Sequence, residues 1–193
     1  KNFSKFDIKI KIPGKQRELK NLTIPLIGVH NIKNAASALS VAFSIGVSDK
    51  IIKKGLKNFK GVQRRFNYLF KKNQIPFFDD YAHHPTEIES VLDGVKKVYN
   101  EEEIVCIFQP HRISRVRSLK KEFSKCFKKA NTVLLCPIYK AGENIKLGFS
   151  YELFAKLIAK NSNVNLIMLK NEHELKKIIK NITFGKKIFI AMG

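Results

Sequence analysis

A ten-residue segment, DDYAHHPTEI (residues 79–88), contains many side chains that can titrate or bind a ligand. Four of them are candidates for contact with a substrate or nucleotide: Asp80, Tyr81, His83 and His84. Of the two aspartates, one is expected to orient a histidine or bind a ribose hydroxyl, and the other can simply cap the turn. Adjacent histidines point in different directions and no further His or Asp stands at ligand spacing, so we expect no metal site here. One histidine is instead expected to contact an anionic or amine substrate, while Pro85 and Glu87 are typical of a first helical turn.

The placement of arginine gives a second indication of a binding site. Lysine outnumbers arginine 31 to six, and five of the arginines form two clusters: Arg64 with Arg65, and Arg112 with Arg115 and Arg117. A guanidinium group is a planar fork that suits phosphate or carboxylate. The first pair is expected to clamp a phosphate at a domain junction. Arg112 and Arg115, three residues apart at the start of a predicted helix, are expected to converge on one anion.

A third set of polar side chains opens a helix predicted over residues 30–46. Asn31 and Asn34 share one helical face at i, i+3, and amide groups suit the edge of an adenine. Together with His30 they are candidates for nucleotide binding. An N-cap role for Asn31 is an equal alternative.

The composition limits the class of protein. The 193 residues, 44% of them hydrophobic, suffice for one good core or for one domain with part of another. No apolar run reaches the roughly 18–20 residues of a membrane span, and no signal-peptide pattern opens the sequence. The three cysteines lack CxxC spacing, so we interpret them as reduced core thiols of a cytoplasmic protein.

The net charge of +21 raises nucleic-acid binding as a function from a different class. The lysines are spread through almost every segment, however, and the 15 Phe stand mainly at core-periodic positions. We therefore expect a lysine-rich solvated surface with no specific nucleic-acid partner, and keep a basic α/β nucleic-acid-binding module as the alternative. A hydrolase that uses His83 or His84 is a third hypothesis, although it lacks a placed nucleophile.

Strands and helices are predicted to alternate over the second part of the chain. The expected strands are 75–79, 103–109, 131–138, 163–169 and 186–192, and the expected helices begin near residues 85, 113, 150 and 171. This order predicts a doubly wound, mostly parallel α/β sheet with right-handed crossovers. Ligands bind beyond the carboxyl ends of the strands in such sheets. Three polar loops are therefore expected at one edge: 79–84, 109–115 and 137–143.

The first part of the chain has a different pattern. Residues 1–27 alternate apolar and polar positions around Pro13-Gly14, which predicts two short strands or a hairpin. Two helices are expected next, the first with a C-cap at Gly46 and the second starting after Ser48 and ending at Gly61. We place a domain boundary near Gly61-Val62, giving domains 1–62 and 63–193.

Five segments together resemble the Mur ligase family. They are GVHNIKNAASAL (28–39), FKGVQRRF (59–66), DDYAHHPTEI (79–88), FQPHRISR (108–115) and YKAGE (139–143). Each is weak alone, but all five occur in the family's order and spacing. The resemblance implies that 1–62 is the end of a central ATP-binding domain and that 63–193 is a Rossmann-like, amino-acid-binding domain.

The resemblance also implies an activity: ATP-dependent joining of L-alanine to UDP-N-acetylmuramate in peptidoglycan synthesis, through an acyl phosphate and with Mg²⁺. By motif position, the residues near the nucleotide would be His30, Asn31, Asn34, Arg65 and Asp80, where Asp80 can alternatively order its loop. Those facing the acyl phosphate and alanine would be Tyr81, His83, His84, Arg112 and Arg115. Arg65, Asp80 and His83 are the candidates for a catalytic role.

Several parts of the family pattern are missing from these 193 residues. There is no GxxGK[ST] phosphate-binding loop, no domain for the UDP group and no set of magnesium ligands. We therefore expect a fragment that needs the remaining domains of the enzyme and has no ligase activity alone. The sister ligase that adds a ready-made tripeptide shares a similar His-His loop, but FQPHRISR favours the alanine-adding type.

Overall fold

The computed structural model describes residues 3–59, 61–62, 64–143 and 149–193. The chain divides into two compact units, Lys1–Gln63 and Arg64–Gly193. Lys60 and Gln63 of the segment 59–66 lie outside the described residues, and Gln63 adjoins the expected boundary.

The first unit is a hairpin packed on two helices. Strands β1 (Ser4–Ile12) and β2 (Lys15–Ile24) pair antiparallel, as the alternation predicts, and helices α1 (Val29–Ser44) and α2 (Asp49–Lys57) follow. Its small core is formed by Ile10, Leu19, Leu22, Leu39, Phe43 and Ile52. The C-cap of α1 is Ile45, one residue before the expected Gly46; Gly46 follows it with a positive φ of 85°, and its N–H bonds to the carbonyl of Phe43. Helix α2 ends at Lys57, before the expected Gly61.

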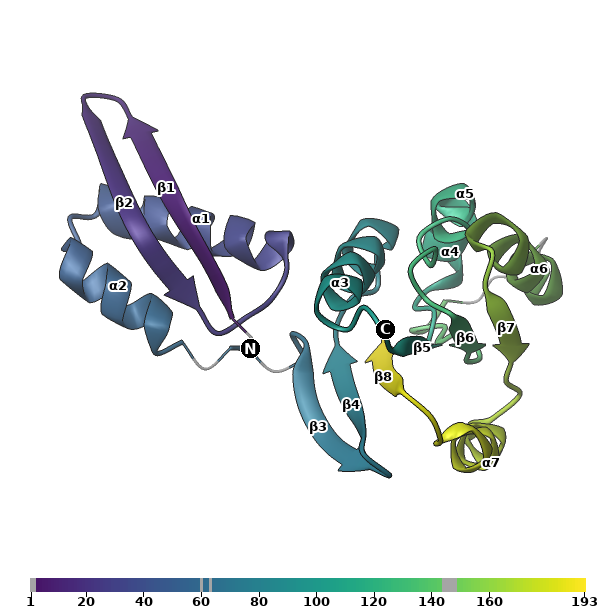
Figure 1. The fold of residues 1–193 in the computed structure, drawn as a ribbon. Coiled ribbons are helices and arrows are strands. Elements are labelled where there is room, and N and C mark those ends of the chain that lie inside the picture. Colours follow the sequence, from purple (N-terminus) through teal and green to yellow (C-terminus); the bar gives the residue numbers. More distant parts are fainter. Residues whose placement is uncertain (1–2, 60, 63, 144–148) are drawn as a thin grey trace. The chain divides into compact units, whose positions relative to one another are not determined.

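The second unit contains a six-stranded sheet in the order β3-β4-β8-β5-β6-β7 (Figure 1). The strands are β3 (Asn67–Lys72), β4 (Ile75–Asp80), β5 (Glu103–Phe108), β6 (Thr132–Leu135), β7 (Asn165–Met168) and β8 (Lys187–Met192). All the strand pairs are parallel except β3 with β4. The predicted mostly parallel sheet is confirmed, and β3 is an edge strand that the sequence pattern did not predict.

Helices cover both faces of this sheet (Figure 1). The larger core lies between one face and α3 (Pro85–Val98), α4 (Ile113–Ser118), α5 (Lys120–Phe123) and α6 (Tyr151–Ser162). The smaller core lies under α7 (Glu172–Ile182) on the other face. The doubly wound arrangement is therefore confirmed. The single helix expected through residues 116–130 is wrong in one respect, because the chain breaks between α4 and α5 at Leu119 (φ −108°, ψ 24°).

The carboxyl ends of four strands meet at one edge of the sheet. Gln109 continues the ladder between β5 and β8 by donating to the carbonyl of Met192, and His111 forms a parallel bridge with Tyr139. Gly193 lies at this edge with a φ of 135°, and a Cβ there would clash with the carbonyl oxygen of Gln109. The loops that were expected to share an edge do share one.

The three cysteines are free thiols, two of them buried, in agreement with their interpretation as reduced core residues. Within the described part of the chain, no helix is both long enough and apolar enough to cross a membrane.

Candidate functional site

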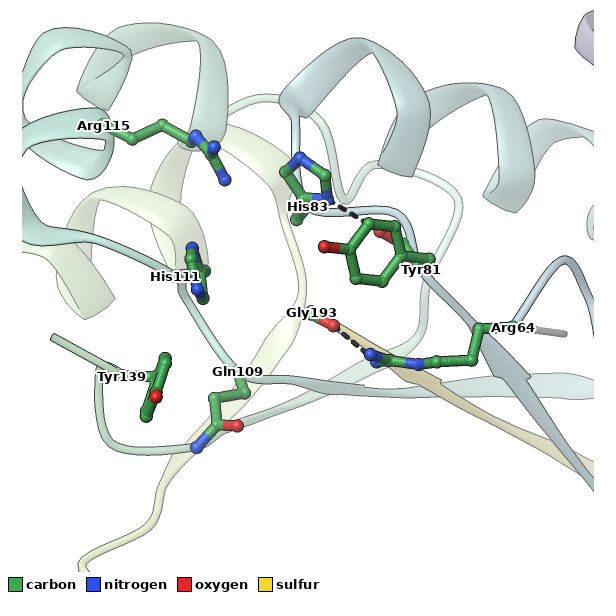
Figure 2. A pocket seen from close by; sticks show the side chains of 8 residues that line it. All are labelled: Arg64, Tyr81, His83, Gln109, His111, Arg115, Tyr139 and Gly193. Carbon is green, nitrogen blue, oxygen red and sulfur yellow. Dashed lines mark hydrogen bonds between the residues drawn. The ribbon is translucent and has the colours of Figure 1, made fainter. Parts of the chain in front are cut away.

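A pocket of about 340 Å³ opens at this edge of the second unit (Figure 2). Its walls come from the segment before β3, from the loops after β4, β5 and β6, from α4, and from the end of β8. The lining residues are Arg64, Tyr81, His83, Gln109, His111, Arg115, Tyr139 and Gly193. Its volume is at the small end of the range for small-molecule sites.

The two adjacent histidines have separate positions. His83 lines the pocket, and its Nδ1 lies 2.9 Å from the carbonyl oxygen of Tyr81. His84 is the N-cap of α3: its Nδ1 accepts from the N–H of Thr86 at 3.4 Å, and Glu87 accepts from the N–H of His84. Because neighbouring side chains of extended backbone point to opposite sides, only one of the pair faces the pocket. The predicted substrate contact of His84 therefore has no support from this geometry.

Glu87 holds the start of α3 in place. Its Oε2 accepts hydrogen bonds from the backbone N–H groups of both His83 and His84, at 3.1 and 3.2 Å. Partial burial alone would raise the pKa of Glu87, but these two N–H groups lower it below its ordinary value. Glu87 is thus an ionised capping residue, in agreement with its interpretation as scaffold.

Asp80 is buried behind the pocket wall. One carboxylate oxygen accepts from the N–H of Ala82 and the other from the N–H of Phe66, both at 2.8 Å. Burial raises the pKa of Asp80, and the two N–H groups oppose that rise. This geometry favours the loop-ordering alternative for Asp80. Its expected nucleotide contact stays a prediction.

Arg64 holds Tyr81 against the pocket. Its guanidinium lies 4.8 Å from the Tyr81 ring, and its backbone carbonyl accepts from the Tyr81 N–H at 2.7 Å. The same guanidinium donates to the carbonyl of Gly193 at 2.6 Å and to Asp79 at 3.3 Å. Its charge is therefore partly neutralised by Asp79. The expected phosphate clamp by this residue has no support from these contacts.

Arg115 is the positive side chain of the pocket wall for which the structure gives no ion-pair partner among the described residues. It extends from α4 into the pocket (Figure 2). Its Nη1 is buried and makes no hydrogen bond to a described residue. A buried donor without a partner is costly, and a bound anion would satisfy it. Arg112, by contrast, is exposed at the N-cap of α4 with a φ of 67° and does not line the pocket.

His111 and Tyr139 complete the pocket and were missed as site residues. Their ring centroids lie 5.3 Å apart, and the Tyr81 and His83 rings form a second pair at 4.8 Å. Burial and the charges of Arg115 and Arg112 lower the pKa of His111 below 6.5, so its imidazole is neutral at pH 7. His111 lies in the segment FQPHRISR and Tyr139 in YKAGE, each directly after a strand. This position at the carboxyl end of a strand could have indicated that they are site residues.

The nucleotide candidates in the first unit differ in exposure. Asn31 is buried, and its Nδ2 donates to the carbonyl of Ile27 at 2.8 Å, whereas Asn34 is exposed and His30 is half-buried. The N-cap of α1 is Gly28, so the alternative N-cap role for Asn31 is wrong. The predicted adenine contacts stay predictions.

Arg65, the expected phosphate contact, belongs to the second unit and is half-buried. Its charge opposes the rise that burial causes in the pKa of Asp80 and adds to the lowering of the Glu87 pKa, which locates it near the start of α3. Its role toward a nucleotide stays a prediction.

The described residues do not fit a complete magnesium site. No group of three His, Cys, Asp or Glu side chains among them is arranged to hold a metal ion.

A mostly parallel sheet covered on both faces, with a pocket beyond its strand ends, defines an α/β domain of the class that binds ligands at the carboxyl ends of its strands. The family model described as "Mur ligase, glutamate ligase domain" matches residues 64–191, which is most of the chain. The chain belongs to the Mur ligase family.

Particular relatives are more informative than the family. The chain is 58% identical to the UDP-N-acetylmuramate–L-alanine ligase of Pelagibacter ubique, an alignment that covers 100% of this chain and 42% of that ligase. It is 35% identical to the ligase of the same name from Bartonella bacilliformis, over 97% of this chain and 40% of the relative. The chain thus spans about two fifths of the length of these relatives.

Solved structures show the same fold. The UDP-N-acetylmuramate–alanine ligase of Thermotoga maritima superposes with a TM-score of 0.73 at 28% identity, covering 98% of this chain and 39% of that one. A murein peptide ligase of Psychrobacter arcticus gives 0.69 at 22% identity, covering 100% of this chain and 41% of that one, and supports the fold alone.

Proposed function

We propose that this chain is part of an ATP-dependent ligase that joins L-alanine to UDP-N-acetylmuramate, and that its second unit binds the L-alanine. The observation that carries the proposal is the buried Nη1 of Arg115, which makes no hydrogen bond to a described residue, in a small pocket at the strand ends. The names of the relatives supply the substrate class.

The alanine carboxylate is the anion proposed for Arg115. A guanidinium fork can make two parallel bonds to a carboxylate, and this one is partly buried, where such bonds are strong. The other pocket arginine, Arg64, is already bonded to Asp79 and Gly193. Arg115 is thus the better of the two for a substrate anion.

The amine of alanine is proposed to lie at His83. A carbonyl oxygen can only accept, so the contact between His83 Nδ1 and the Tyr81 carbonyl assigns the ring proton to Nδ1. In the neutral ring, Nε2 is then a bare acceptor. It can accept a hydrogen bond from the ammonium group and take the proton that must leave before the nitrogen attacks an acyl phosphate. Neutral His111 adds no competing positive charge.

The nucleotide would be held elsewhere. We propose that Asn31, Asn34 and His30 contact the adenine and that Arg65 contacts the phosphates. ATP phosphorylates the muramate carboxylate, and Mg²⁺ would neutralise phosphate charge with ligands from the part of the relatives' length that this chain does not span. We propose that this part is required for activity and that the enzyme works in the cytoplasm.

A hybrid enzyme tests the proposal. The 193 residues would replace the matching part of the Pelagibacter ubique ligase, and phosphate release from ATP would be measured with each substrate omitted in turn. We expect release that requires both UDP-N-acetylmuramate and L-alanine, and no release from the 193-residue chain alone.

Two results would contradict the proposal. A hybrid that folds but uses a tripeptide in place of L-alanine would indicate the tripeptide-adding ligase. Alanine-dependent release by the 193-residue chain alone would show that the remaining length is not needed.

A further inference from the structure

Helix α4, which carries Arg115, does not cap itself. It has six residues, too few to be stable in isolation, and its N-cap residue Arg112 makes no side-chain capping bond. The first N–H groups of any helix need partners from outside it. The position of the Arg115 guanidinium therefore depends on what holds the start of α4.

Glu143 supplies that partner from another loop. Its Oε2 accepts from the N–H of Ser114 at 3.0 Å, and its Oε1 accepts from the Ser114 hydroxyl. The side-chain and backbone hydrogen bonds from Ser114 lower the pKa of Glu143, so its carboxylate is ionised at pH 7. A charged carboxylate in the first turn of a helix is also favourable to the helix dipole.

A tight turn directs Glu143 toward α4. Ala141 and Gly142 have φ values of 51° and 80°, and the N–H of Glu143 donates to the carbonyl of Lys140 at 3.0 Å. Upstream, the N–H of Arg112 donates to the carbonyl of Tyr139 at 2.9 Å. The loop after β6 is thus tied to the start of α4 at two points, one at Tyr139 and one at Glu143.

Ser114 immediately precedes Arg115 in the chain. A shift of the first turn of α4 would move the Arg115 backbone and with it the fork that faces the pocket. Binding sites lose affinity when a fork is displaced, because both of its bonds depend on geometry.

We propose that Glu143 is a positioning residue for substrate binding: through Ser114 it caps α4 and fixes Arg115 in the orientation that receives the alanine carboxylate. This inference rests on the proposed function, since it takes alanine as the ligand of Arg115. Glu143 itself does not line the pocket and need not touch the substrate.

The experiment uses the hybrid enzyme with Glu143→Ala and Glu143→Gln. We expect Glu143→Ala to raise the KM for L-alanine about five- to tenfold, the factor that corresponds to loss of a helix cap, with kcat and the KM for ATP nearly unchanged. Glu143→Gln keeps an acceptor for Ser114 and is expected to restore most of the affinity. The control is Glu174→Ala, which removes a carboxylate that accepts from the N–H of Lys170 at the start of α7, on the other face of the sheet. It should leave the KM for L-alanine unchanged.

A double variant separates positioning from general structural damage. In an Arg115→Ala background, Glu143→Ala should have no further effect on the KM for L-alanine, because the group that it positions is gone. A full additional effect, or an equal rise in the KM of all three substrates, would overturn the inference. If Glu143→Ala does not fold, the same comparisons with Ser114→Ala, which removes the hydroxyl that donates to Glu143, decide the question.

The failure of this inference differs from the failure of the proposed function. A hybrid with Glu143 in place that shows no alanine-dependent activity contradicts the function. An active hybrid whose Glu143→Ala variant binds alanine normally contradicts only the positioning role.

Discussion

Replacement of Arg115 by lysine probes the pocket at the donor that has no partner in the described residues. Lysine keeps the positive charge but cannot form two parallel bonds to a carboxylate. A hydrogen bond to a charged group contributes about 1.5–3 kcal/mol. Loss of one such bond should therefore lower kcat/KM for L-alanine by roughly 10- to 150-fold, at about 1.4 kcal/mol for each factor of ten. The KM for ATP should hardly change.

The same substitution should have little effect on stability, or a small favourable one. Nη1 of Arg115 is buried and makes no hydrogen bond to a described residue, so its removal relieves a desolvation penalty and breaks no hydrogen bond of that atom within the described part of the chain. This combination, with activity lost and stability kept, is the signature of a group held in place for a ligand.

Steady-state kinetics of the hybrid enzyme, with L-alanine varied at saturating ATP, measures the first effect, and urea unfolding measures the second. Arg117→Lys is the matched control, because Arg117 lies on the same short helix but is exposed and outside the pocket. The reasoning is refuted if the KM values for alanine and ATP rise equally, or if Arg117→Lys has as large an effect as Arg115→Lys.

Three further predictions concern groups around the pocket. Asp80→Asn should lower the free energy of unfolding by about 1–3 kcal/mol in urea at pH 7, because an amide NH2 would face one of two buried N–H donors. Burial raises the pKa of Asp80 above 3.8. The contribution of this shift to the free energy of unfolding is therefore complete below pH 3.8 and is lost as the pH rises through the folded-state pKa. The Asn variant should lack this pH dependence of the free energy of unfolding. His84→Ala should cost about 0.5–2 kcal/mol and leave the alanine KM unchanged, with His84→Asn restoring the cap; a raised alanine KM would contradict the capping role. The His111 imidazole, followed by NMR, should titrate below 6.5, so that it destabilises the fold as the pH falls below 6.5, and Arg115→Ala should raise this pKa; an unchanged value would contradict the charge effect.

The sheet could be predicted because its strands are buried on both faces. Strands such as Ile104 to Phe108 are continuous apolar runs bounded by polar loops, which sequence periodicity detects well. Strand β3 was not predicted because it is an edge strand with almost all of its residues exposed, so it lacks the buried apolar positions that mark the central strands. The break at Leu119 was not predicted because the apolar positions continue at helical spacing on both sides of it, and most of them are buried as expected.

The site could be located from the sequence but not resolved into individual roles. Chain order predicts that the loops after β4, β5 and β6 meet, because parallel strands end at one edge. Whether a polar side chain faces the ligand or a buried backbone group depends on contacts between distant segments. One of the two partners of Asp80, for example, is the N–H of Phe66, 14 residues earlier. The positions of Arg64 and His111 in the pocket wall were not predicted, because they depend on contacts with Tyr81 and Tyr139 that only the fold creates.

The tyrosines in the pocket wall also allow ligand binding to be followed by the intrinsic fluorescence of this chain. The sequence has no Trp and only five Tyr, and two of these, Tyr81 and Tyr139, line the pocket. Both are among the exposed large side chains, at 45% and 56%. Tyrosine fluorescence excited in the near ultraviolet is thus free of the indole emission that dominates in most proteins, and a large fraction of it originates at the binding site. Occupancy of the pocket by a small ligand can therefore be followed without a label, with Tyr139→Phe as the variant that isolates the signal of Tyr81 within it.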